Sequence, residues 1–227
     1  MNSDIDKNMP RLLGAVFLLQ ALGSLIGGLI RDSIIGTGDI IDSMTNISKN
    51  TSLIQVSIAT EMITGFAVVM LGALLYLTLK KQDMKIALVA MGLYLMEVAT
   101  IIISGIALFA LSRISQESVV AGHPDYLQTL GTLFLEIHEF AFGTVLMFFF
   151  AFGATLFYYL FYRSGYLPQG LALFGFLVAL LSSIGILFVL FDISVPLFYV
   201  LILHLPFELG TGLWLLVKGI RDGSETK

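Results

Sequence analysis

Long apolar runs separated by short polar stretches dominate the chain. A helix that crosses a bilayer needs about 20 mostly apolar residues, and the segments that meet this requirement are 11–30, 53–79, 86–112, 138–162, 169–191 and 195–217. The runs are continuous, whereas a transmembrane barrel needs short alternating segments. We therefore predict an all-α, polytopic integral membrane protein in which residues 1–227 form a single domain of six transmembrane helices in one bundle.

Two stretches on the predicted outer side depart from a simple bundle. Within the loop 31–52, apolar residues follow helical spacing from Ile40 to Ile47, and Asp39 can cap the start. This pattern predicts a short outer amphipathic helix, acting either as a lid over a cavity or as an interfacial anchor. Residues 126–163 would form one helix about 57 Å long, against a hydrocarbon core of about 30 Å. That segment must therefore protrude, tilt or break.

Composition agrees with this class and excludes several others. Hydrophobic residues make up 57% of the chain and charged residues only 12%, where a soluble domain carries about 25% charged residues. So few charges exclude a water-soluble globule, a disordered chain and a nucleic-acid-binding protein. Cysteine is absent, which excludes a disulfide framework, a thiol nucleophile and an iron–sulfur cluster.

The basic residues predict an orientation, because cytoplasmic loops are enriched in Lys and Arg. With six spans, one side would hold Lys7, Arg11, Lys80, Lys81, Lys85, Arg163, Lys218, Arg221 and Lys227, and the other Arg31, Lys49 and Arg113. We therefore expect a multi-pass protein of the cell membrane with both termini in the cytoplasm.

Ionisable side chains within the apolar runs are the candidates for function, since such groups are costly in a membrane and usually face an interior cavity. We expect them to line an outward-opening acidic pocket formed by Gln20, Glu61, Tyr94, Glu97, His204 and Glu208, with an outer rim of Glu136, His138 and Glu139. No Lys or Arg lies deep in a predicted span. The carboxyls should therefore be protonated, paired with a histidinium, hydrated or bound to a cation. The structural alternative is that each is protonated and hydrogen-bonded to a neighbouring helix.

Several segments, in order, carry a family resemblance: Glu61, LLYLTLKK (74–81), GLYLME (92–97), LEIHEFAF (135–142), YRSGYLP (162–168), LPFEL (205–209) and WLLVKG (214–219). Together they resemble the prokaryotic membrane family catalogued as domain of unknown function 4386, from the first span to Lys218. The resemblance implies a six-span bacterial or archaeal membrane protein, no particular activity, and Glu61, Glu97, His138 and Glu208 as the positions of interest. The family often has an arginine where this chain has Tyr94, so the resemblance implies that Glu97 has lost an internal partner.

Three functions remain open from the sequence. The one we expect is binding or transport of a small cation, a proton-coupled solute or an amphiphile, with no enzymatic activity and no certain cofactor. The second is an intramembrane hydrolase of lipid-like substrates that uses a divalent metal, with His204, Glu208, Glu61 and His138 as candidate ligands. The third is a non-catalytic structural or accessory subunit. The expected partners are the lipid bilayer and a small-molecule or lipid ligand, and no nucleic acid. The sequence indicates no oligomeric state.

Overall fold

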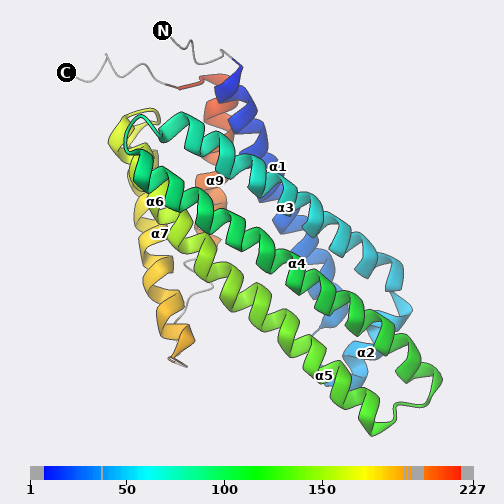
Figure 1. The fold of residues 1–227 in the computed structure, drawn as a ribbon. Coiled ribbons are helices and arrows are strands. Elements are labelled where there is room, and N and C mark those ends of the chain that lie inside the picture. Colours follow the sequence, from blue (N-terminus) through cyan, green and yellow to red (C-terminus); the bar gives the residue numbers. More distant parts are fainter. Residues whose placement is uncertain (1–7, 37, 192, 194, 196–201, 221–227) are drawn as a thin grey trace. The chain divides into compact units, whose positions relative to one another are not determined.

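The long apolar runs form helices. The computed structural model describes residues 8–36, 38–191, 193, 195 and 202–220, and its regular elements are all helical (Figure 1). Five helical segments are long and apolar enough to cross a membrane, namely α1 (Met9–Ile35), α3 (Thr51–Leu79), α4 (Met84–Val120), Asp125–Ser164 and α7 (Gln169–Leu190). Two further helices are shorter, α2 (Ile40–Lys49) and α9 (His204–Val217). The chain is thus an all-α, multi-pass membrane protein.

The predicted sixth span, 195–217, corresponds within the described residues to α9 alone. Residues 196–201 of that prediction lie outside the described part of the chain. Since α9 begins at His204, Pro206 falls in its first turn, where a missing amide hydrogen removes no helical hydrogen bond.

Three helices extend beyond the spans predicted for them. The span predicted as 11–30 continues as helix to Ile35, and the span predicted as 86–112 continues to Val120. The helix that contains the predicted span 138–162 begins earlier, at Asp125. Each predicted boundary lies near the first charged or polar residues, and the helices continue through those residues. The difference arises because hydropathy marks the lipid-compatible part of a helix, whereas backbone hydrogen bonding continues through polar residues. Gly36 then ends α1 with a φ of +68°, the left-handed conformation common after a helix C-terminus.

The segment of about 40 residues that had to protrude, tilt or break is continuous. It consists of α5 (Asp125–Phe140), a π-helical turn η1 (Ala141–Leu146) and α6 (Met147–Ser164). A π-helical turn inside an α-helix is rare and is frequently found at functional sites. The residues in and next to this turn, Ala141–Leu146, are therefore candidates for a functional site.

The chain divides into two compact units. Unit 1 comprises Met1–Ala21, Phe66–Val98 and Met147–Lys227. Within it α6 packs on α7 and α7 on α9, around a core that includes Leu75, Tyr94, Phe157, Tyr158 and Phe207.

Helices α1 and α9 approach closely within unit 1. A Cβ added to Gly14 would lie 2.6 Å from the carbonyl oxygen of Gly212 and 2.8 Å from the amide nitrogen of Leu216. Met9, at the start of α1, also receives a hydrogen bond from Thr78 near the end of α3, with Oγ1 3.9 Å from its Sδ. The start of α1 and the ends of α3 and α9 therefore lie at one end of this unit.

Unit 2 comprises Leu22–Gly65 and Ala99–Leu146. The predicted short helix is confirmed as α2, and the Asp39 side chain caps it by accepting a hydrogen bond from the backbone N–H of Asp42 at 2.9 Å. Its apolar face is buried, because Met44 and Ile47 join a core with residues of α3 and α4. Helix α2 also packs on α5, so protein contacts hold it in place.

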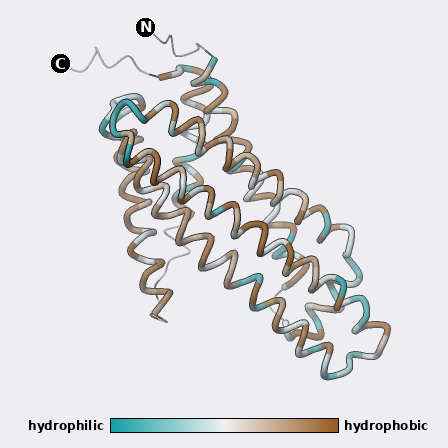
Figure 2. The backbone as a smooth tube through the Cα atoms, in the orientation of Figure 1, coloured by the Kyte–Doolittle hydropathy of each residue, from teal (hydrophilic) through white to brown (hydrophobic). Residues whose placement is uncertain are grey.

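Large apolar side chains cover the outside of the long helices. Leu29, Phe66 and Ile106 are among those exposed, and Figure 2 shows hydrophobic residues along most of each long helix, with hydrophilic residues concentrated near the turns. An exposed surface of this kind suits a lipid solvent, in which only backbone polar groups must be satisfied internally.

Candidate functional site

A buried ion pair joins α1 to α3 in unit 2. The Nη1 atom of Arg31 donates to Oε1 of Glu61 at 3.0 Å, and the two side chains are only 10% and 5% exposed. The Nε atom of Arg31 donates to Oδ1 of its neighbour Asp32 at 2.9 Å. The expectation that the intramembrane carboxyls lack a basic partner is therefore wrong for Glu61. It failed because α1 was predicted to end at residue 30, which placed Arg31 in a loop.

His138 faces this ion pair from α5. Its Nδ1 atom lies 2.8 Å from the hydroxyl oxygen of Ser104 and 3.2 Å from the Ser104 carbonyl oxygen, on α4. A carbonyl oxygen can only accept, so the second contact requires a hydrogen on Nδ1. In that tautomer Nε2 carries a free lone pair. One turn later, Phe142 stacks on the imidazole with ring centres 6.0 Å apart.

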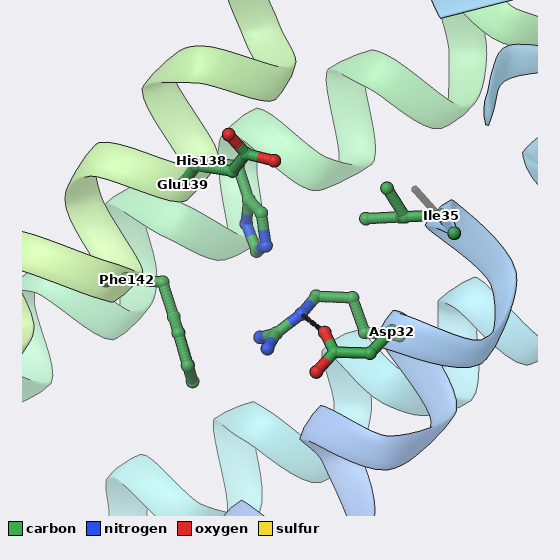
Figure 3. Close-up of a pocket in the computed structure, with 8 residues that line it drawn as sticks. Asp32, Ile35, His138, Glu139 and Phe142 are labelled. Carbon is green, nitrogen blue, oxygen red and sulfur yellow. Dashed lines mark hydrogen bonds and ion pairs between the residues drawn. The ribbon is translucent and has the colours of Figure 1, made fainter. Parts of the chain in front are cut away.

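Phe142 belongs to the π-helical turn and also meets the arginine. The guanidinium carbon of Arg31 lies 4.2 Å from the centre of the Phe142 ring, a cation–π contact. Figure 3 shows Asp32, His138 and Phe142 around one space, with Asp32 on a different helix from the other two. The π-helical turn therefore supplies the aromatic wall of a site.

The space between these side chains is a cavity of about 450 Å³, within the range typical of small-molecule pockets. Its lining consists of Arg31, Asp32, Ile35, Gly36, His138, Glu139, Phe142 and Gly143. Both Asp32 and Glu139 are exposed, so carboxylates stand at the accessible edge. Arg31 is paired with Asp32 and with Glu61, and Glu139 adds a third carboxylate to the site, which therefore has an excess of negative charge.

The three residues predicted as an outer rim lie at different places relative to this pocket. His138 and Glu139 line it, whereas Glu136 is exposed and lies outside the lining. Sequence reasoning missed Arg31, Asp32 and Phe142 as site residues. A solitary arginine directly after an apolar run, followed by a solitary glutamate in the next run, was the signal that could have indicated the pair.

The other predicted pocket residues belong to unit 1, whereas Glu61 belongs to unit 2. Buried side chains there include Gln20 on α1, Tyr94 and Glu97 on α4, and His204 and Glu208 on α9. Tyr94, Glu97 and Glu208 are close enough to interact electrostatically. Nε2 of His204 lies 2.9 Å from the Ser182 hydroxyl oxygen on α7.

The four candidate metal ligands are divided between the units. His204 and Glu208 lie in unit 1, and Glu61 and His138 in unit 2. Among the residues that the structure describes, no group of three or more His, Cys, Asp or Glu is placed to hold a metal ion.

Comparison with known proteins gives a family for the chain. The model of a family described as "Domain of unknown function (DUF4386)" matches residues 12–219. The chain belongs to this family. No curated protein and no solved structure matches it. Membership of this family assigns no activity to the chain.

Proposed function

We propose that this DUF4386 protein binds a small organic cation with an apolar portion in the pocket of unit 2. The observation that carries the proposal is the charge balance around the cavity of about 450 Å³. Arg31 is already paired with Glu61 and Asp32, whereas Glu139 has no ion pair within the described part of the chain. A cation entering the pocket would therefore meet an uncompensated carboxylate.

The same charge balance disfavours an anionic ligand. Such a ligand could approach Arg31, but it would have to do so past Asp32 and Glu139 at the edge of the pocket. An ammonium group close to Glu139 would gain a favourable interaction, although a modest one, since exposed ion pairs contribute at most about 1 kcal/mol. The apolar portion would lie against Ile35 and Phe142, which supply apolar surface in the lining.

The experiment measures binding of butyltrimethylammonium to the purified full chain by calorimetry in detergent micelles, with butanesulfonate as the anionic comparison. We expect the cation to bind and Glu139→Gln to weaken its affinity by about fivefold, equivalent to about 1 kcal/mol. Glu136→Gln is the matched control, since Glu136 is an exposed glutamate on the same helix outside the pocket. Tighter binding of the sulfonate, or equal effects of the two variants, would overturn the proposal.

The proposal includes a location, the cell membrane with both termini in the cytoplasm. The distribution of Lys and Arg supports it, because basic residues flank the end of unit 1 where α1 begins and α3 and α9 finish. Arg11, Lys80 and Lys218 all belong to that end. Contacts of Met9 with Thr78 and of Gly14 with α9 place these helix ends together, as an orientation with both termini on one side requires.

A further inference from the structure

Unit 1 encloses a group of ionisable side chains that the pocket of unit 2 does not use. It consists of Tyr94 and Glu97 on α4, Tyr158 on α6, and His204 and Glu208 on α9, none of them more than 5% exposed. The α1 and α7 helices contribute the uncharged Gln20 and Ser182 to the buried polar residues of this unit. Glu97 and Glu208 are close enough for their charges to repel each other, and Tyr158 interacts with Glu208.

The hydrogen bond of His204 determines which of its nitrogens is free. Ser182 donates its only hydroxyl hydrogen to the carbonyl oxygen of Val178 at 3.0 Å. Toward His204 the serine oxygen can therefore only accept, so Nε2 of His204 carries the hydrogen and Nδ1 carries a lone pair. Nδ1 of His204 is buried and has no hydrogen-bond partner in the residues described.

Two more atoms of this group are buried without a hydrogen-bond partner in the described part of the chain. Oε2 of Glu97 and the hydroxyl of Tyr158 are buried, and no described residue makes a hydrogen bond of good geometry with either. Buried polar groups are nearly always satisfied, so such atoms require an explanation in an unseen water, proton or ion. Unit 1 therefore contains such atoms on α4, α6 and α9.

The charge of Glu97 and Glu208 indicates which species is bound there. In the described ranges the ion pairs involve Arg31 only, so no Lys or Arg neutralises Glu97 or Glu208. Leaving both carboxylates ionised there would carry a large desolvation penalty for each of them. A metal ion would need more ligands than this group offers, since no three His, Asp or Glu of the described chain are suitably placed. One proton bound to a carboxyl oxygen removes the desolvation cost of that carboxyl and the repulsion between the two, and it needs no further ligand.

We propose that Glu97 and Glu208 form a proton-binding site within unit 1 that holds at least one exchangeable proton at neutral pH. The proton comes from water, forms an O–H bond on one carboxyl and returns to water on release. Tyr158, which interacts with Glu208 and whose ring centre lies 6.3 Å from that of His204, is the neighbouring group through which the proton would pass. The proposal does not depend on cation binding in unit 2, because it rests on different residues.

Infrared spectroscopy of the full chain in nanodiscs tests the site through the C=O stretching band of protonated carboxyl groups. At neutral pH we expect the wild type to show this band and the band to shift in deuterated water. Glu97→Gln and Glu208→Gln should each reduce it, whereas Glu136→Gln, at an exposed position, should leave it unchanged. The band should also persist when sodium replaces a large organic cation in the buffer.

Three results would overturn the proposal: no band at neutral pH, a band that survives the double Glu97→Gln, Glu208→Gln replacement, or a band that sodium removes. Chemical labelling of the unmodified chain avoids any dependence on folding of the variants. Dicyclohexylcarbodiimide is apolar and reacts with protonated carboxyls, so peptide mapping should locate the adduct on Glu97 or Glu208. Adducts confined to other carboxyls would contradict the proposed site.

Discussion

Replacing Arg31 with methionine should destabilise the protein far more than replacing its partner Glu61 with glutamine. Arg31→Met keeps an apolar stem of similar length but leaves the Glu61 carboxylate buried without a cation. Glu61→Gln keeps an oxygen that can still accept the 3.0 Å hydrogen bond from Arg31. The arginine also retains Asp32 at 2.9 Å. The asymmetry arises because Arg31 has a second carboxylate and Glu61 has no second cation in the described residues.

The magnitudes follow from burial. Removing one partner of a buried ion pair costs about 3–5 kcal/mol, and loss of the contact with Phe142 adds about 0.5–1 kcal/mol. Glu61→Gln exchanges a charged hydrogen bond for a neutral one, a difference of about 1 kcal/mol. At 2–4 °C per kcal/mol for a chain of this size, Arg31→Met should lower the thermal midpoint by roughly 7–24 °C and Glu61→Gln by a few degrees.

Circular dichroism of the purified variants during heating in one detergent gives the midpoints. Arg113→Met is the control, because Arg113 is exposed and a surface substitution should change stability by no more than about 0.5 kcal/mol. The double variant Arg31→Met, Glu61→Gln should be more stable than Arg31→Met alone, since it leaves no buried charge. The reasoning is refuted if Arg31→Met behaves like Arg113→Met, or if Glu61→Gln is the more damaging single change.

Two further predictions concern packing and orientation. Gly175→Ala should destabilise the protein by about 1–3 kcal/mol, because the added Cβ would overlap the Phe207 ring. Gly170→Ala on the same helix is the control, since a Cβ there meets open space. Equal losses of thermal stability in the two variants would contradict the packing. Because the chain lacks cysteine, a single introduced cysteine can report the side of the membrane on which it lies. A membrane-impermeant maleimide added to intact cells should label the Glu117→Cys variant and not the Lys81→Cys variant. The reverse result would contradict the proposed orientation.

The sequence predicted which segments are helical but not where the helices end. Continuous apolar runs identify α1 and α4, since only a helix satisfies its backbone inside lipid. Hydropathy falls at Arg31 and Arg113, yet both lie inside helices. Helix α2 was predictable almost to the residue, because Asp39 is a strong N-cap and the apolar spacing that follows is helical.

The site was predictable only in part, for a related reason. His138 and Glu139 stood out as polar residues at the edge of an apolar run. Arg31 and Glu61 are 30 positions apart, and nothing local in the sequence shows that their helices pack together. The π-helical turn that presents Phe142 has no residue signature of its own. Both features depend on tertiary contacts that a hydropathy pattern does not contain.

The Arg31–Glu61 pair also bears on how the chain enters a membrane during synthesis. On insertion scales a charged residue at the centre of a helix costs about 2.5–3.5 kcal/mol when it faces lipid alone. In the pair, Arg31 donates a 3.0 Å hydrogen bond to Glu61, so each side chain has a partner of opposite charge. Insertion of α1 and α3 together, as a helical hairpin with α2 in the connection, therefore meets a lower barrier than insertion one helix at a time. An ion pair that supplies one lining residue of the cavity, Arg31, thus also favours an order of assembly.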